Sequence, residues 1–189
     1  YDICARIDSP TCTHIRVCLT GFVELKRWKP RLIAALKRTV TMEFVFAHPK
    51  SPFIELRATS LSQPQSDLED ILDENRKTIK EIISTAAQQL QTEQQPEGKL
   101  GAITLKWTDS AMPVPYAQID DAIYVGAFWL KCAVGDGPFL LFDALSSSGK
   151  FYHDQFRQVW DKAMFDRLEG NEIPPMSKTG LATNPGIPK

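Results

Sequence analysis

Apolar residues recur along the chain in two patterns of spacing, one typical of strands and one typical of helices. Short runs rich in β-branched and aromatic residues predict six strands, over 14–22, 40–49, 100–107, 115–120, 122–130 and 138–145. Apolar positions three and four residues apart predict four helices, over 24–38, 51–61, about 66–91 and 148–168. From Gly170 onward Pro, Gly, Ser and Thr predominate, which indicates a flexible tail.

The order of these elements, β-α-β-α-α-β-β-β-β-α, determines the expected fold class. The opening strand–helix–strand unit implies a parallel pair with a right-handed crossover. The later strands are joined by turns such as VGDG (134–137), which implies antiparallel pairing. We therefore expect an α/β fold in which helices pack on a mixed sheet. Because 189 residues with 43% hydrophobic content can bury one core, we expect one domain over 1–169 and a tail over 170–189.

The composition of the chain indicates in which compartment the protein resides and which classes of partner it binds. The formal net charge is −1, so we expect no positive field that collects nucleic acid, and we exclude nucleic acid as a partner. The cysteines lack C-x-x-C spacing, which indicates free, mostly buried thiols in the cytoplasm. No apolar run reaches the roughly 18–20 residues that cross a bilayer. The chain begins at Tyr1 without a signal peptide, and we interpret it as a domain cut from a longer protein.

Three segments resemble the phospholipase D-like superfamily: FVFAHPKSPFIELRA (44–58), PYAQIDDAIYVGAF (115–128) and GPFLLFDALSSSGKFYHDQFRQVWDKA (137–163). They are most similar to its small bacterial branch, which is attached to helix-turn-helix or other signalling domains. The resemblance runs from about Ile15 to Ala163 and implies a single phospholipase D-like half. Active members carry H-x-K-x-x-x-x-D followed by G-S-x-N, in which a histidine attacks phosphorus while lysine and asparagine hold the phosphoryl oxygens.

This catalytic motif is absent from the matching stretch. Residues 110–130 contain neither histidine nor lysine. Asp120 and Gly126 match the motif aspartate and glycine, but Ala127 and Trp129 stand where serine and asparagine are expected. The resemblance therefore implies a domain that is not an enzyme.

The resemblance implies that the domain keeps a cleft at the strand ends. In active members of the superfamily this cleft binds a phosphodiester. The resemblance implies a non-catalytic sensory or regulatory domain that binds a small phosphorylated ligand, such as a nucleotide signal, or a partner. Such a domain would control an attached output domain. Two alternatives stay open: a dimerisation or scaffold module, because active members pair two halves, and a divergent phosphodiesterase that uses His48. We expect a homodimer, no cofactor and no metal.

Five candidate ligand-binding residues lie at the ends of the first two predicted strands or just after them. Thr20 offers a hydroxyl, and Gly21 permits close approach of the backbone. His48, Lys50 and Ser51 lead into a helix start, whose free N–H groups favour an anion. In the alternative interpretation these residues form plain strand-to-helix turns, in which Ser51 caps the helix and His48 is solvated.

Two further candidates lie within predicted helices. Arg57 could bind a phosphate through two hydrogen bonds, although we prefer a surface ion pair with Glu55 or Glu43. Asn75 interrupts the apolar stripe of the long helix and needs a partner, because an unpaired buried polar group costs about 1–3 kcal/mol. That partner is more commonly internal than a ligand or a second subunit.

The last two candidates lie on the predicted strand over 115–120. Tyr116 and Gln118 are two residues apart, so they share one face of the strand. With Trp107 nearby they could form an aromatic and amide platform for a nucleobase. The alternative is that both residues fill the core, with the glutamine at its edge.

Overall fold

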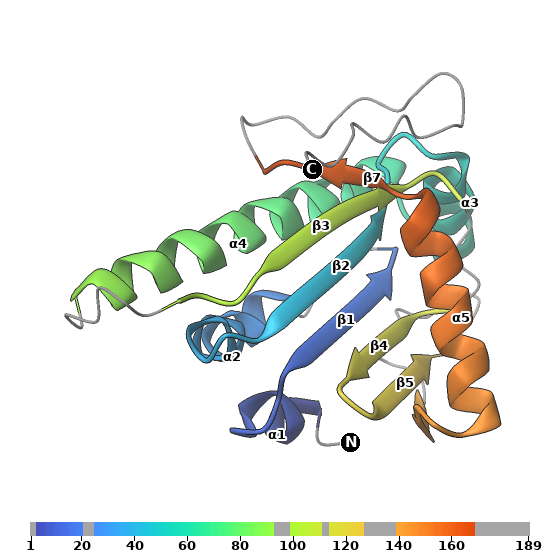
Figure 1. Ribbon diagram of the computed structural model, residues 1–189. Coiled ribbons are helices and arrows are strands. Elements are labelled where there is room, and N and C mark those ends of the chain that lie inside the picture. The colour runs from blue at the N-terminus through green and yellow to red at the C-terminus, as the bar shows by residue number, and fades with distance from the viewer. Residues whose placement is uncertain (1–2, 21–24, 93–98, 111–113, 127–138, 169–189) are drawn as a thin grey trace, which may run out of the picture.

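Seven strands form one mixed sheet at the centre of the computed structural model, which describes residues 3–20, 25–92, 99–110, 114–126 and 139–168 (Figure 1). In chain order the strands are β1 His14–Leu19, β2 Thr41–Ala47, β3 Ile103–Thr108, β4 Tyr116–Ile119, β5 Ala122–Gly126, β6 Phe139–Asp143 and β7 Met164–Asp166. Across the sheet their order is β6-β5-β4-β1-β2-β3-β7. Strands β1, β2 and β3 are parallel, and all other pairings are antiparallel. The expected α/β class with a mixed sheet is confirmed.

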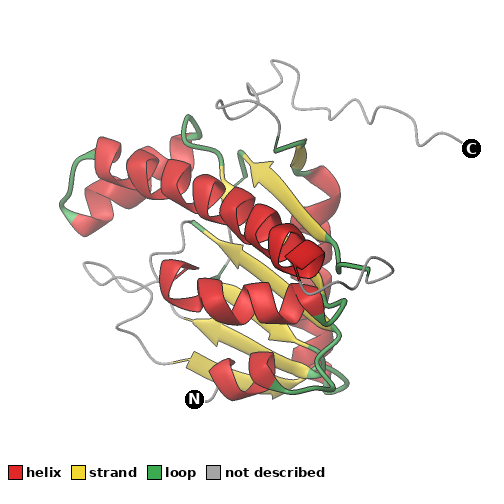
Figure 2. Ribbon diagram, turned by 90° about the vertical axis from the view of Figure 1, so that its left-hand side faces the viewer, coloured by secondary structure: helices red, strands yellow, loops and turns green. Residues whose placement is uncertain are grey.

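The helices cover the two faces of this sheet unequally. They are α1 Ile3–Asp8, α2 Leu25–Lys37, α3 Pro52–Leu61, α4 Gln65–Thr92 and α5 Ser147–Lys162. Helices α1, α2 and α4 lie side by side over one face (Figure 2), while α5 lies on the opposite face (Figure 1). Both crossovers between parallel strands advance in the same direction across the sheet, so right-handed connections place α2 and α4 on the same face. Of the helices in the described ranges, none is long and apolar enough to cross a membrane.

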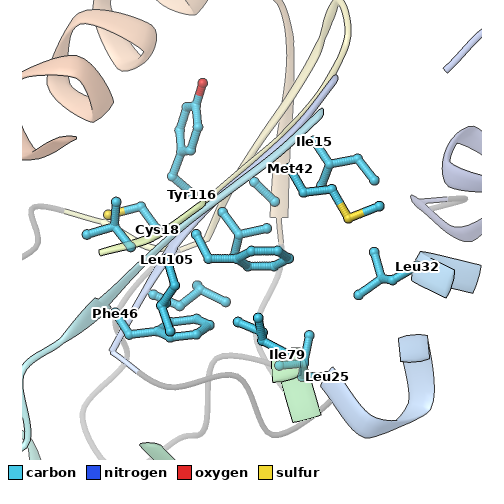
Figure 3. Packing of buried hydrophobic residues seen from close by; sticks show 14 of the residues in the cluster. Ile15, Cys18, Leu25, Leu32, Met42, Phe46, Ile79, Leu105 and Tyr116 are labelled. Atoms are coloured by element: carbon cyan, nitrogen blue, oxygen red, sulfur yellow. The ribbon is translucent and has the colours of Figure 1, made fainter. Parts of the chain in front are cut away.

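Alternation along the strands divides their side chains between the two faces. Ile15 of β1 and Met42 of β2 point toward the layer of α2 and α4, where Leu32 belongs to the same core (Figure 3). Cys18 and Tyr116 point to the other face, toward α5 (Figure 3). The hydrophobic core therefore has two parts, one between the sheet and the layer of α2 and α4, and one between the sheet and α5, where Phe156, Val159 and Trp160 are buried.

Two elements were not expected from the sequence. Helix α1 precedes β1 and buries Ile7 completely. The last expected helix, over 148–168, is wrong at its end: α5 stops at Lys162 because Ala163 is extended, with φ −74° and ψ 145°, and β7 follows. Residues 127–138, with the end of an expected strand and the VGDG turn, lie outside the described residues, as does the tail.

The expected free thiols are confirmed for Cys4, Cys12 and Cys18, of which the last two are buried. Burial raises the pKa of the Cys18 thiol to about 12. Because the thiolate is the reactive form, Cys18 is an inert core residue.

Candidate functional site

Four of the candidate residues gather at the end of the parallel strands, which we call the carboxyl edge: Thr20, His48, Lys50 and Ser51. Leu19 of β1 is paired with Phe46 of β2, so both strands leave the sheet at this edge. Helix α3 begins just beyond the end of β2 (Figure 1). Gly21 lies outside the described residues. The carboxyl edge of parallel strands is where open α/β sheets commonly bind ligands.

Two hydroxyls at the carboxyl edge are buried without a hydrogen-bond partner. Thr20 is 6% exposed and Ser51 is 2% exposed, and neither Oγ1 of Thr20 nor Oγ of Ser51 has a partner. Each such group lowers the stability of the folded protein by about 1–3 kcal/mol relative to a hydrogen-bonded group. A buried polar atom left in this state is a place where a bound polar group would stabilise the protein.

Ser51 stands at the N-cap of α3 but does not cap the helix with its side chain. Pro52 follows at the start of the helix, as expected for a residue that has no N–H to satisfy. By contrast, Ser146 at the N-cap of α5 accepts a hydrogen bond from the N–H of Gly149 at 3.0 Å. The start of α3 therefore keeps the partial positive charge of its N–H groups without a side-chain acceptor from its own N-cap.

The two N-cap serines should respond differently to truncation. We expect Ser146→Ala to lower the free energy of unfolding by about 1 kcal/mol, because it removes a capping hydrogen bond. Ser51→Ala removes a hydroxyl that makes no hydrogen bond, so without ligand it should leave stability unchanged or raise it by up to about 1 kcal/mol. Chemical denaturation of both variants measures the difference. Equal losses would contradict the assignment of Ser51 as an unused cap.

His48 is an interior residue, so its interpretation as a solvated turn residue is wrong. It is 3% exposed, and its ring meets that of Trp107 edge to face at a centroid distance of 6.4 Å. The N–H of Lys50 donates to its Nδ1 at 3.1 Å, which places the proton of the neutral ring on Nε2. The backbone N–H of His48 also donates to the carbonyl of Thr108 at 2.7 Å, which ties the turn to β3.

A spacing close to the catalytic motif, which is not among the expectations above, begins at His48. His48, Lys50 and Glu55 follow the pattern H-x-K-x-x-x-x-E, one carboxylate type away from the superfamily motif. The geometry separates these residues, because the histidine ring is interior and holds the Lys50 N–H, whereas the side chains of Lys50 and Glu55 are exposed. The arrangement orders a turn and does not present the ring to solvent.

The two helical candidates are buried and engaged within the protein. Arg57 is 7% exposed and its Nη1 donates to Ser60 Oγ at 3.3 Å. Arg57 is therefore not at the surface, as the preferred interpretation had it, and Glu43 forms its ion pair with Arg16. Asn75 is buried and also has a partner in the fold, which fits the internal alternative.

Tyr116 and Gln118 do not form an exposed platform. Tyr116 is 3% exposed and stacks on Phe156 of α5 at a centroid distance of 5.1 Å. Its hydroxyl donates to Gln118 Oε1 at 2.5 Å, and burial raises its pKa above the usual value. Trp107 belongs to β3, which is three places away from β4 in the sheet, and is fully buried. The interpretation that these residues fill the interior is the correct one.

Gln118 is the centre of a polar cluster that the sequence analysis did not identify. Arg16 Nη1 lies 3.3 Å and His153 Nδ1 3.2 Å from Gln118 Oε1, and Arg16 Nε donates to Glu43 Oε2 at 2.6 Å. Gln118 Nε2 donates to the carbonyl of Asp120 at 2.7 Å, which fixes the orientation of the amide. Because the amide oxygen only accepts, His153 donates from Nδ1.

The signal that could have located this cluster is the pairing of two charged residues in adjacent apolar strands. Arg16 and Glu43 are the direct register partners of β1 and β2, and each interrupts a run of apolar residues. Burial and the nearby Arg16 charge lower the pKa of His153 below its usual value. The ring is therefore neutral near pH 7, and the cluster ties α5 to the sheet.

Asp120 shapes the opposite end of the strands. It adopts φ 49° at the turn between β4 and β5, and its Oδ1 accepts from the N–H groups of Thr13 and His14 and from the Thr13 hydroxyl. Burial raises its pKa, but these hydrogen bonds outweigh burial and hold it below the usual value. Within the described ranges no group of three His, Cys, Asp or Glu side chains could hold a metal ion.

Comparison with known proteins assigns no family to this chain. No protein-family model matches the chain, and no curated protein matches it. Among solved structures, TrmBL2, an archaeal chromatin protein whose structure shows a novel mode of DNA binding, is similar with a TM-score of 0.47 and 14% sequence identity. The match covers 85% of this chain and 47% of that one, so the chain spans about half the length of TrmBL2. At this level the likeness assigns no function to this chain.

One expectation needs correction in view of that neighbour. We excluded nucleic acid as a partner on the basis of net charge, yet the similar structure belongs to a DNA-binding protein. The physical reason is that net charge averages over the chain. Helix α2 alone carries five basic residues and no carboxylate, namely Lys26, Arg27, Lys29, Arg31 and Lys37. The exclusion of nucleic acid is withdrawn.

Proposed function

We propose that this chain is a non-catalytic regulatory domain, a single phospholipase D-like half that binds a small phosphorylated ligand at its carboxyl edge. In this proposal the occupied domain controls an attached output domain. The fold assignment within the α/β class is supported by the resemblance of three segments to that superfamily. The ligand class is supported by the chemistry of the carboxyl edge.

The observation that carries the proposal is the pair of buried hydroxyls without partners, Thr20 Oγ1 and Ser51 Oγ. Both belong to turns that leave adjacent parallel strands. Phosphate oxygens accept hydrogen bonds from hydroxyl and backbone N–H groups, and the start of α3 offers such N–H groups. The exposed Lys50 adds a cation beside the same helix start.

Thermal unfolding with added ligand tests this proposal. We expect inorganic phosphate or one class of mono-, di- or cyclic nucleotide to raise the melting temperature, because a ligand at 100 times its Kd adds about 2.7 kcal/mol of stability. Lys50→Ala should weaken that ligand about threefold to tenfold without changing stability in its absence. Lys150→Ala is the matched control, since Lys150 is also exposed but lies in the first turn of α5.

Two outcomes would count against the carboxyl edge as the site. One is the absence of any shift across the whole set of phosphates and nucleotides. The other is the same shift in Lys50→Ala, Ser51→Ala and the Lys150→Ala control. A separate phosphodiesterase assay tests the non-catalytic part, and turnover that is lost in His48→Ala would overturn it.

A further inference from the structure

Strand β6, Phe139–Asp143, forms one edge of the sheet, and its outer side meets no other strand of the described chain. Its pairing with β5 is regular over all five residues, so each of them belongs to the ladder. Leu140 and Leu141 are 58% and 47% exposed. Because neighbouring residues of a strand point to opposite faces of the sheet, β6 leaves an apolar side chain exposed on each face.

The opposite edge of the sheet has the protection that β6 lacks. Strand β7 is three residues long, and it directs the carboxylate of Asp166 into the protein, where Arg76 binds it. Short edge strands and inward-pointing charges are features by which proteins prevent association through sheet edges. In β6 the one charged residue is Asp143, at the end of the strand. Of the two edges, β6 is therefore the one that can pair with a further strand.

The exposed apolar surface continues from β6 onto α5. Helix α5 packs on the strand through Tyr152, whose ring centroid lies 5.2 Å from that of Phe142. Beside this contact, Phe151 of α5 is 57% exposed, and Leu145 in the connection is 78% exposed. We call the surface formed by Leu140, Leu141, Leu145 and Phe151 the β6 edge. It holds four of the six large exposed hydrophobic side chains in the described ranges, a concentration typical of a protein–protein contact.

The backbone hydrogen bonds show which groups of β6 point outward. The N–H of Ala144 donates to the carbonyl of Asp121 at 2.7 Å, and these two residues continue the register of β5 and β6. In an antiparallel ladder, hydrogen-bonded and non-hydrogen-bonded pairs alternate. Leu140 and Phe142 therefore direct their N–H and C=O groups to β5. Leu141, between them, directs its N–H and C=O to the outer side.

These features specify what can cover the β6 edge. The outward N–H and C=O groups require an extended strand, and the leucines on both faces require apolar side chains on that strand. Strand β6 itself meets both requirements. A second copy of this chain can therefore cover the edge without any charged group from either copy.

We propose that the β6 edge binds the same edge of a second copy of this chain, so that the two sheets join across a two-fold axis. In such a contact residue i meets j and j meets i, which makes the two identical strands antiparallel. With the axis at Leu141, the N–H and C=O of this residue face those of the partner's Leu141, and Leu140 lies opposite the partner's Phe142. Asp143 then lies opposite Phe139. An axis at Asp143 would instead place two carboxylates opposite each other, which is unfavourable.

Sedimentation equilibrium of the full chain over a range of concentrations tests this association. We expect a reversible dimer. Leu141→Lys should weaken it about tenfold, because two lysines would face each other across the axis in place of two leucines. Leu56→Lys is the matched control, since Leu56 of α3 is 69% exposed and lies outside the β6 edge, and it should leave the dimer unchanged. A chain that is monomeric at every concentration, or equal association of the two lysine variants, would overturn the proposal.

A cysteine at the axis tests the register and does not depend on the stability of the lysine variant. In a hydrogen-bonded antiparallel pair the Cα atoms are about 5.5 Å apart, a separation that a disulfide can span. Mild oxidation should therefore link Leu141→Cys into a covalent dimer in higher yield than Leu56→Cys or the unchanged chain, whose own cysteines give the baseline. Equal yields from the three proteins would contradict an axis at Leu141. Both assays omit phosphate and nucleotide, so their results are independent of ligand binding at the carboxyl edge.

Discussion

Replacing Asp166 by alanine should lower the free energy of unfolding by about 3–5 kcal/mol, the largest effect that we expect from a single polar substitution. Asp166 lies in β7, the short edge strand that the sequence did not predict. Its side chain is 1% exposed, and that of its ion-pair partner Arg76 in α4 is 5% exposed. Truncation would remove the carboxylate that binds the guanidinium with two hydrogen bonds, so the desolvation of that buried charge would be offset less.

The contacts of Asp166 join three elements. Arg76 donates to it twice, from Nε to Oδ2 at 2.6 Å and from Nη2 to Oδ1 at 3.1 Å. The indole Nε1 of Trp107 in β3 donates to Oδ2 at 2.8 Å, and the N–H of Leu168 donates to Oδ1 at 2.7 Å. Helix α4, strand β3 and the end of the described chain therefore share one buried carboxylate.

Chemical denaturation of Asp166→Ala measures this loss. Asp161→Ala is the matched control, because Asp161 forms an exposed ion pair with Arg157 at 3.4 Å, which is worth about 0–1 kcal/mol. The double variant Arg76→Met/Asp166→Leu should be less destabilised than Asp166→Ala, because it removes both charges together. A loss below about 1 kcal/mol in Asp166→Ala would show that the pair does not support the fold.

The same pair makes stability depend on pH. Burial raises the pKa of Asp166, but hydrogen bonds from Arg76 and Trp107 outweigh burial and hold it below the usual value. The folded state therefore binds the proton less readily than the unfolded state. This contribution is fully present above the unfolded pKa of about 4 and is lost as pH falls through the lower folded pKa. The slope of stability against pH in this acidic range should decrease in Asp166→Ala.

Replacing Gly149 by alanine should lower the free energy of unfolding by about 1–3 kcal/mol. In an isolated helix this change stabilises by about 1 kcal/mol, since glycine is the poorer helix former. In α5, however, a Cβ on residue 149 would lie 1.9 Å from the carbonyl oxygen of Asp143. That atom belongs to the backbone of β6, so the clash is relieved only if the start of α5 moves away from the sheet edge.

Ser148→Ala provides the control for Gly149→Ala. Ser148 is exposed one position earlier in the same helix turn, so its replacement should change stability by no more than about 0.5 kcal/mol. Thermal or chemical denaturation of the two variants shows whether Gly149→Ala lowers or raises the free energy of unfolding. A gain in stability in Gly149→Ala would mean that helix propensity dominates and that α5 does not pack closely on Asp143.

The central strands of the sheet could be predicted from the sequence because their residues are mostly apolar, β-branched or aromatic. Strands β1, β2 and β3 are apolar and β-branched over most of their length, and α4 carries an apolar stripe. The short elements α1 and β7 were missed because six and three residues are too few to show a period. Their stability comes from partners distant in sequence, such as Arg76 for β7.

For the candidate site, the sequence identified which residues follow the strands but not what surrounds them. Thr20, His48, Lys50 and Ser51 were expected at one edge because parallel strands end together. Whether a polar side chain is solvated or buried depends on the elements packed over it, so His48 and Tyr116 were open to either interpretation. Burial and hydrogen bonding of those two residues are set by Trp107 and Phe156, which come from other elements.

By itself the sequence determined the α/β class and the residues that occupy the strand ends, because both follow from local periodicity and chain order. Only the tertiary structure decided which polar groups are satisfied. Gln118 of β4 contacts Arg16 of β1 and His153 of α5, whereas the hydroxyls of Thr20 and Ser51 have no hydrogen-bond partner. The physical reason is that a hydrogen bond requires two groups within about 3 Å, and residues distant in the sequence reach that separation only in the folded protein.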